Sequence, residues 1–241
     1  MQKNEYRRIL KRGIQELGIK YREELFEILW IYKEFLLLEN TKYNLTAITE
    51  PREIAVKHFL DSLSLLKFRE ILPGERVIDI GSGAGFPGLV LKLYQPEMEL
   101  VLVDSLFKRV SFLNKLINKL EIKNIKTIHC RAEDLGKDEK YRESFNWALS
   151  RAVAPVNILA EYTLPLCKKG GMTVFYKGPD YLKELKEADT AISLLGGRVE
   201  KSAKIKLPDS GEERNLIFIY KDRATPCKYP RRAGVPKKRP L

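Results

Sequence analysis

Four closely spaced glycines mark the stretch of this sequence that is best suited to bind a ligand. In VIDIGSGAGFPG, residues 77–88, Gly81, Gly83 and Gly85 alternate with other residues, and Gly83, Gly85 and Gly88 match the spacing G-x-G-x-x-G. Glycine permits a positive φ and carries no Cβ that would hold a ligand away from a turn. Such a turn can cradle the pyrophosphate of a dinucleotide, but a single match is weak evidence. The neighbouring residues must show which ligand it holds, or whether it is a tight turn that binds nothing.

Two aspartates near this turn favour a positively charged nucleoside ligand. Asp79 lies just before Gly81, where its carboxylate could reach the edge of a cleft and meet an amino group, whereas it would repel a pyrophosphate. Asp104 ends the next apolar run and is suited to accept hydrogen bonds from the two hydroxyls of a ribose. Asp104 could equally be the N-cap of the helix that follows. Charge therefore favours S-adenosylmethionine over a dinucleotide.

Short apolar runs separated by amphipathic segments place this turn in an α/β fold. The expected strands are residues 76–80, 99–104, 126–130, 146–150 and 172–177. This alternation predicts a parallel sheet covered by helices on both faces. Residues 198–220 contain two further β-like stretches joined by the turn-rich PDSGEER, which predicts an antiparallel hairpin. A hairpin after the fifth strand is the usual ending of a methyltransferase sheet and not of a dinucleotide-binding sheet.

Helices precede the expected sheet, and a basic tail follows it. Residues 22–38 carry apolar side chains at helical spacing, and a second helix is expected from Pro51, with Thr49 as its N-cap, to about Phe68. We expect one domain over residues 1–241. It comprises a helical extension (1–72), an α/β core (73–222) and a basic tail (223–241).

The charge of the chain suggests a polyanionic partner. Lysine and arginine number 44 against 32 aspartates and glutamates, a formal net charge of +12. Residues 221–241 hold eight basic side chains and one acidic side chain. A cluster of this sign can bind nucleic acid by releasing condensed counterions, although a tail that only keeps the protein in solution would look the same. Tyr229 could stack on an exposed base or help the tail to fold back.

Other classes of protein are disfavoured by what the sequence lacks. The strongest apolar run, residues 28–39, is interrupted by Lys33 and Glu34, so we expect no membrane span. The first residues lack a signal-peptide pattern and the three cysteines lie far apart, which favours the cytoplasm. Two histidines and no CxxC motif give no familiar metal-ligand spacing, so we expect no metal.

From about residue 40 to its C-terminus, the sequence resembles the ribosomal RNA small subunit methyltransferase G family, also called the glucose-inhibited division protein B family. The glycine turn alone marks only the methyltransferase superfamily, whereas GFPG, SRA and YPRR in this order are more specific. The matching motifs are NLTAI from Asn44, HFLDSL from His58, DIGSGAGFPG from Asp79, DSLFKR from Asp104, RAE from Arg131, SRAVA from Ser150, KG from Lys177 and YPRRAGVP from Tyr229.

The resemblance implies a Rossmann-like class I methyltransferase with a mostly parallel seven-stranded sheet. It implies transfer of a methyl group from S-adenosyl-L-methionine to N7 of one guanine in 16S rRNA, with 16S rRNA or the small ribosomal subunit as partner and a monomer as the active form. Guanine N7 carries a lone pair and no proton, so we expect no catalytic base, and catalysis would depend on aligning N7 with the methyl group. Another RNA or base position, a non-catalytic RNA-binding module and a dinucleotide-dependent oxidoreductase are the alternatives.

The resemblance also implies which residues contact the cofactor, and several of them have another interpretation. Phe86 could instead be a packing residue, Asp134 could replace Glu133 as the acceptor for adenine, and Arg151 could form a purely structural ion pair. His58 and Asp61 could hydrogen-bond through an intervening group or hold the helical extension against the sheet. The expected cofactor-binding residues are Gly81, Phe86, Asp104, Ala132, Glu133 and Arg151.

Overall fold

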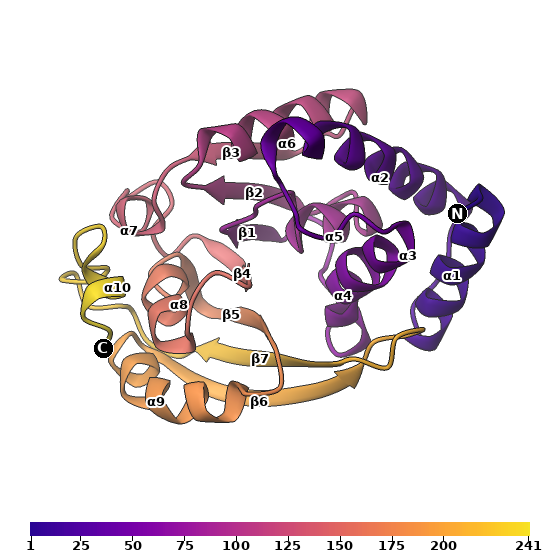
Figure 1. The fold of residues 1–241 in the computed structure, drawn as a ribbon. Helices are drawn as coiled ribbons and strands as arrows, with labels where there is room; N and C mark the ends of the chain where they lie inside the picture. Colours follow the sequence, from indigo (N-terminus) through magenta and orange to yellow (C-terminus); the bar gives the residue numbers. More distant parts are fainter.

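The computed structural model describes residues 1–241 and contains one seven-stranded sheet between two layers of helices (Figure 1). The strands lie in the order β3-β2-β1-β4-β5-β7-β6. Strands β1 to β5 run parallel, and β7 is antiparallel to both β5 and β6. The parallel core and the C-terminal hairpin predicted from the sequence are therefore confirmed. The bounds are β1 (Arg76–Ile80), β2 (Glu99–Asp104), β3 (Ile125–His129), β4 (Phe145–Arg151), β5 (Cys167–Lys177), β6 (Gly197–Lys206) and β7 (Glu213–Lys221).

Strand β5 begins earlier than the sequence pattern predicts. Cys167 pairs with Phe145, and Met172 pairs with Trp147, so the register shifts between the two pairs. Gly170 lies in this stretch with a φ of +82°. Glycines weaken a strand pattern because they have no side chain to pack. The irregular start of β5 therefore looks like a loop in the sequence.

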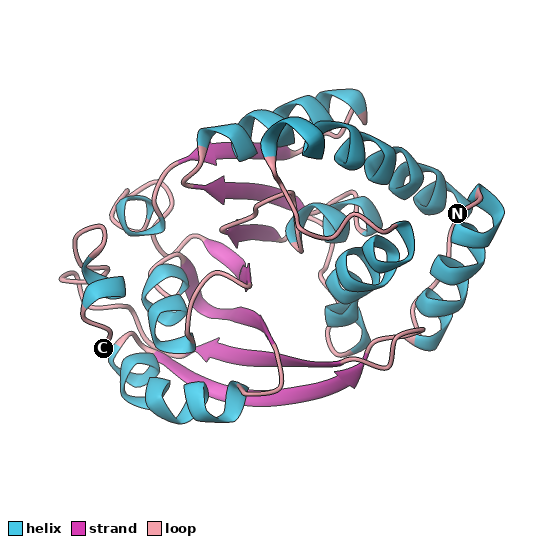
Figure 2. Ribbon diagram, viewed as in Figure 1, coloured by secondary structure: helices cyan, strands magenta, loops and turns pink.

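Helices lie on both faces of the sheet (Figure 2), and neighbouring residues of β1 belong to different apolar clusters. Val77 belongs to the apolar cluster that contains residues of α2 (Glu23–Tyr43), α5 (Gly88–Tyr94) and α6 (Phe107–Lys119). Ile78 belongs to the cluster that contains residues of α7 (Ala132–Leu135). Helices α8 (Val156–Thr163) and α9 (Tyr181–Leu194) pack in a third cluster, against β5 and β7. Because side chains alternate along a strand, both faces of the sheet are buried.

The helical extension packs on the α5 and α6 side of the sheet. The sequence pattern missed α1 (Lys3–Glu16), whose Tyr6, Leu10 and Ile14 are buried in the same cluster as Val77. The second expected helix is a continuous series of short elements, and its N-cap is Glu50, whose side chain accepts a hydrogen bond from Glu53 N at 2.8 Å. The prediction of Thr49 as N-cap is therefore wrong. The series is α3 (Pro51–Glu53), the π-helical η1 (Ile54–Leu60), α4 (Asp61–Leu63) and the 3₁₀ turn η2 (Ser64–Lys67).

The basic tail folds back onto the body of the protein. Tyr229 is buried, and Arg142 donates hydrogen bonds to the carbonyls of Thr225 and Tyr229, each at 2.7 Å. The tail packs against α8, where Arg231 pairs with Glu161, and Tyr229 joins the apolar cluster that contains Phe175 of β5. A last short helix, α10 (Val235–Lys238), lies near α8 at the yellow end of the chain (Figure 1).

Candidate functional site

A cavity of about 600 Å³ opens where the parallel strands end. It is bordered by the glycine turn after β1, by Asp104 at the end of β2, and by the segment that follows β4. The chain passes from β1 outward to β2 and β3 and then returns to place β4 on the other side of β1. Open α/β sheets bind their ligands at such a switch of direction, and the volume suits a small-molecule ligand.

The glycine turn is shaped partly by packing and partly by the cavity. Gly81 has a φ of +73°, and a Cβ added there would lie 2.4 Å from Cγ2 of Val153. A Cβ at Gly88 would lie 2.8 Å from the Asp79 side chain, so this glycine lets α5 approach β1. At Gly83, by contrast, an added Cβ has no neighbour nearer than 3.9 Å. The turn is thus open at Gly83 and tightly packed at Gly81 and Gly88.

Asp79 does not reach the cavity edge, contrary to the prediction. Its side chain is fully buried, and Oδ2 accepts a hydrogen bond from Gly88 N at 2.8 Å, while Oδ1 has no hydrogen-bond partner. The alternation of β1 explains this position, since Asp79 shares the α5 face with Val77. Burial raises the pKa of Asp79 to about 7. Its carboxylate therefore lies beneath the turn and holds α5.

Asp104 borders the cavity and accepts hydrogen bonds from the backbone on either side of it. The residue is only 2% exposed, and its carboxylate accepts hydrogen bonds from Gly83 N and Leu106 N, both at 2.9 Å. Arg109 pairs with the same carboxylate at 3.2 Å. The N-cap of α6 is Leu106, so Asp104 is not the helix cap that the sequence allowed as an alternative. Asp104 fixes the glycine turn relative to α6 and also lines the cavity.

Ala132 and Glu133 line the cavity from α7. Glu133 is 3% exposed and accepts a hydrogen bond from Gly234 N in the tail at 2.8 Å. Asp134 is exposed and does not line the cavity. Of the two carboxylates that the sequence offered, the structure thus brings Glu133 to the cavity.

Tyr162 and Lys237 also line this wall, although the sequence did not single them out as site residues. Burial and the nearby Glu133 raise the pKa of Tyr162 to about 12. Lys237 reaches the wall because the tail folds back and places α10 beside α8. Nothing in the local sequence pattern signals either contact, since both depend on how distant elements pack.

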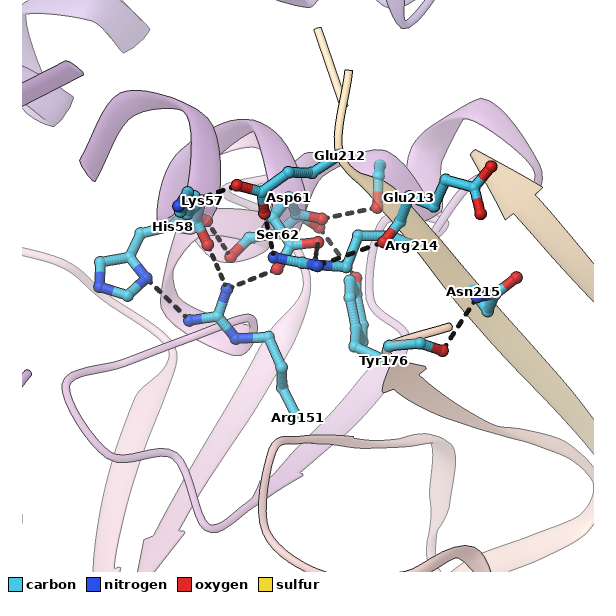
Figure 3. A network of polar contacts seen from close by, with 12 residues as sticks. Lys57, His58, Asp61, Ser62, Arg151, Tyr176, Glu212, Glu213, Arg214 and Asn215 are labelled. Carbon is cyan, nitrogen blue, oxygen red and sulfur yellow. Dashed lines mark hydrogen bonds and ion pairs between the residues drawn. The ribbon is translucent and has the colours of Figure 1, made fainter. Parts of the chain in front are cut away.

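Arg151 lines the cavity and also hydrogen-bonds to residues of the helical extension (Figure 3). From the end of β4, its guanidinium donates to Asp61 Oδ2 at 2.8 Å, to Lys57 O at 2.9 Å and to Nδ1 of His58 at 3.2 Å. Arg214 lies 3.3 Å from the other oxygen of Asp61. The buried ion pair considered for Arg151 is therefore present, and Arg151 lines the cavity as well. It is also the intervening group that links His58 to Asp61.

Phe86 forms part of an aromatic stack at the same end of the cavity. Its ring lies 4.3 Å from the His58 ring and 5.5 Å from the Tyr32 ring, both nearly parallel to it. The guanidinium of Arg151 lies 5.0 Å from the Phe86 ring centroid. The Tyr32 hydroxyl donates to the carbonyl of Ala84. Phe86 is therefore both a packing residue and a lining residue.

The histidine that lines the cavity is not free to accept a proton. Burial, followed by the Arg151 charge, lowers the pKa of His58 to about 3, and its Nδ1 already accepts from Arg151. Asp79 is covered by the turn. No His, Cys, Asp and Glu side chains gather in groups of three or more that could hold a metal ion. None of the helices has the length and apolar character that a membrane span needs.

Comparison with known sequences gives matches over nearly the whole chain. Residues 26–217 match the family model described as rRNA small subunit methyltransferase G. A relative named ribosomal RNA small subunit methyltransferase G, from Alkaliphilus metalliredigens, is 45% identical over 237 residues, which cover 98% of this chain and 99% of the relative. Its namesake from Thermoanaerobacter pseudethanolicus is 46% identical over 241 residues, which cover 99% and 100%.

Solved structures share the fold at much lower identity. TrmN from Thermus thermophilus has a TM-score of 0.53 at 16% identity, with 67% of this chain and 48% of that chain covered. TYW2 from P. horikoshii, solved in complex with MeSAdo, has a TM-score of 0.53 at 14% identity, with 68% and 63% covered. At these identities the likeness concerns the fold alone, and it agrees with the predicted Rossmann-like class I methyltransferase fold.

Proposed function

We propose, since the chain belongs to the rRNA small subunit methyltransferase G family, that it transfers a methyl group from S-adenosyl-L-methionine to N7 of a guanine in 16S rRNA. The observation that carries this proposal is the cavity at the switch point. Two carboxylates that line it, Asp104 and Glu133, follow β2 and β3 on one side of β1, and the guanidinium of Arg151 comes from the end of β4 on the other side. This distribution complements a ligand with a nucleoside at one end and an amino acid at the other.

The residues present fit S-adenosylmethionine. Asp104 would accept from the ribose hydroxyls, and Glu133, with the backbone N–H of Ala132, would bind the edge of the adenine. Arg151 uses three of its five N–H donors within the protein, so two are left to bind the methionine carboxylate. Gly81 and Phe86 would border the methionine portion. When bound, S-adenosylmethionine supplies a methyl group on a positively charged sulfur.

The engagement of His58 within the protein is consistent with attack by guanine N7, which needs no base. The N7 lone pair forms the new bond to the methyl carbon as the bond from that carbon to sulfur breaks. The products are a positively charged N7-methylguanine and neutral S-adenosylhomocysteine. No proton moves in this step, so the protein contributes alignment of the two reactants and exclusion of water. A cavity whose only histidine is neutral and already hydrogen-bonded is suited to this role.

Basic side chains beside the cavity support an RNA partner. Lys237 lines the cavity, and Arg232, Lys238 and Arg239 are exposed on the same folded tail. Such a surface would attract the phosphates of RNA. The proposal includes the cytoplasm as the location and a monomer as the active form.

Methyl transfer from labelled S-adenosylmethionine tests the proposal. The purified protein would be incubated with unmodified 16S rRNA and, separately, with small ribosomal subunits, and the label would be located by nucleoside analysis. We expect label in N7-methylguanosine. Label on another nucleoside would indicate another target, and binding of RNA without transfer would indicate a non-catalytic binding module. Displacement of the cofactor by a nicotinamide nucleotide would favour an oxidoreductase.

A further inference from the structure

Thr46 is held rigidly at the edge of the cavity by the C-terminal part of α2. The side-chain oxygen of Asn40 accepts from Leu45 N at 2.6 Å and from Thr46 N at 2.9 Å, and the Asn40 amide donates to Thr46 O at 3.0 Å. Thr46 is half-buried and lines the cavity next to His58. Its side chain is therefore presented at the cavity from a fixed backbone.

The hydrogen bond from Arg151 determines which nitrogen of His58 carries the proton. A guanidinium can only donate, so Nδ1 of His58, 3.2 Å away, must be the acceptor (Figure 3). His58 is neutral at physiological pH because burial and the Arg151 charge lower its pKa. The single ring proton is therefore on Nε2, which lies 3.0 Å from Oγ1 of Thr46 and donates to it.

This arrangement leaves the Thr46 hydroxyl as a donor only. Its oxygen accepts from Nε2 of His58 and also from the backbone N–H of Ile48, at 3.0 Å. A hydroxyl has two acceptor lone pairs and one proton. Since both lone pairs are used, the hydroxyl can bind a ligand only by donating its proton to an acceptor.

The location of Thr46 places this donor at the end of the cavity away from the adenosine subsite. Asp104 and Glu133 come from the ends of β2 and β3, on one side of β1. Thr46, His58 and Arg151 lie together near the end of β4, on the other side of β1. The methionine portion of the cofactor and the incoming base would meet at this end.

On the basis of the function proposed above, we propose that the Thr46 hydroxyl donates a hydrogen bond to O6 of the target guanine and makes the site selective for guanine over adenine. Guanine presents two acceptors, N7 and O6, on its major-groove edge, whereas adenine presents the N6 amino donor in place of O6. A fixed donor would pair with guanine O6 and oppose the adenine amino group. The methionine carboxylate is better matched to the cationic Arg151, which leaves Thr46 for the base.

Substitution of Thr46 combined with a base lacking O6 tests this contact. Thr46→Val removes the hydroxyl, Thr46→Ser keeps it, and Thr49→Val alters an exposed threonine of the same loop as a control. Each protein would be assayed on RNA with guanine or with 2-aminopurine, which retains N7 but lacks O6, at the target position. On guanine, Thr46→Val should lower kcat/KM about ten-fold, the effect of one lost hydrogen bond. Thr46→Ser and Thr49→Val should retain most of the activity.

The loss of kcat/KM caused by Thr46→Val should disappear on 2-aminopurine, which lacks the acceptor O6. On 2-aminopurine, Thr46→Val and the unsubstituted protein should have similar kcat/KM, because neither can form the contact. A role for Thr46 in folding alone would instead give the same ten-fold loss on both bases, and that result would overturn the inference. If Thr46→Val does not fold, Thr46→Cys, with its weaker S–H donor, gives the same comparison.

Two measurements made without RNA complete the test. Calorimetry should give the same affinity for S-adenosylmethionine with Thr46→Val as with the unsubstituted protein, and a parallel loss of affinity would assign the hydroxyl to the cofactor and overturn the inference. Nitrogen chemical shifts of His58 should show the proton on Nε2. A proton on Nδ1 would overturn the inference, because Thr46 would then not be restricted to donating. If the unsubstituted protein forms no N7-methylguanine, the proposed function fails. If it does so but the two bases respond alike, only the role of Thr46 fails.

Discussion

Arg151 combines a contact with the cavity and a buried ion pair, and substitution should separate the two effects. Arg151→Ala removes the donors left for the cofactor and leaves the 3%-exposed Asp61 side chain with only Arg214 as a charged partner. We expect at least roughly ten-fold weaker binding of S-adenosylmethionine by calorimetry. We also expect a loss of about 3 kcal/mol in the free energy of unfolding, because breaking a buried pair leaves a charge uncompensated.

Arg214→Ala is the matched control for this experiment. Arg214 contacts the same Asp61 carboxylate but does not line the cofactor cavity. Arg214→Ala should lower the free energy of unfolding while leaving the affinity for S-adenosylmethionine nearly unchanged. An equal loss of affinity in both variants would mean that the network as a whole, and not the Arg151 side chain, determines cofactor binding.

Two adjacent carboxylates on α7 should respond differently to neutralisation. Glu133→Gln changes a residue that lines the cavity, whereas Asp134→Asn changes one that is exposed. We expect Glu133→Gln to weaken binding of S-adenosylmethionine several-fold, since hydrogen bonds to charged groups are stronger than those to neutral ones. Asp134→Asn should bind normally. The reverse order of affinities, measured by calorimetry, would exclude Glu133 as the adenine contact.

Asp79 should make stability fall as the pH rises. Its pKa is raised from 3.8 to about 7, so the folded state binds the proton more tightly, and this contribution to stability is present below about pH 4 and lost toward pH 7. The pKa of His58 is lowered from 6.5 to about 3, so its contribution is present above about pH 6.5 and is lost on acidification. The two effects oppose each other between about pH 4 and 6.5.

Asp79→Asn should remove the contribution of Asp79 to the pH dependence of stability and leave that of His58. Between about pH 5 and 7, the free energy of unfolding of the variant should rise relative to that of the unsubstituted protein by about 2 kcal/mol. Urea denaturation at the two pH values would measure this difference. Parallel pH dependences in the two proteins would show that Asp79 is already ionised in the folded state.

Among the structural elements, the folded tail contains basic residues with different roles. Arg232, Lys238 and Arg239 are exposed, so their joint replacement by alanine should reduce the slope of log affinity for RNA against log salt by up to about one unit for each lost phosphate contact. Filter binding at several salt concentrations would give the slope. An unchanged slope would show that the RNA lies elsewhere.

Arg231 belongs to the fold and is not a suitable member of that set. Its guanidinium forms several hydrogen bonds with the carboxylate of Glu161, which is 1% exposed on α8. Arg231→Ala should therefore lower the free energy of unfolding by roughly 3 kcal/mol, as expected for a broken buried pair. Thermal unfolding would detect this loss, and a variant as stable as the unsubstituted protein would show that the tail contributes little to the fold.

The sequence was sufficient to predict those helices and strands whose signals are local. It did not predict the contacts made between distant elements. The strands around Val77 and Leu102 are short apolar runs, and the alternation of such runs with amphipathic segments was sufficient to predict a parallel sheet. The motif resemblance led to Glu133 and Arg151, and both line the cavity. The burial of Asp79 and the contact of Gly234 with Glu133 depend on how α5 and the tail pack, and no local period records such packing.

In the molecule as a whole, the helical extension and the sheet share one apolar cluster, so they should unfold together. Residues of α1 and α2 lie in the same cluster as Val77 and Leu102. The two tryptophans report on different parts, because Trp30 is in α2 and Trp147 is in β4. Urea transitions of Trp30→Phe and Trp147→Phe, followed by the fluorescence of the remaining tryptophan, should have the same shape, each single and cooperative. A separate early transition reported by Trp30 would make the extension an independent unit.

The hydrogen bond between Gly234 and Glu133 has a consequence for what keeps the cavity closed. Gly234 bonds to a residue 101 positions earlier in the chain, and Lys237 of the same tail lines the cavity beside α7. The wall beside α7 is therefore complete only while the tail stays docked. Detachment of the tail would open the cavity without changing any residue of α7.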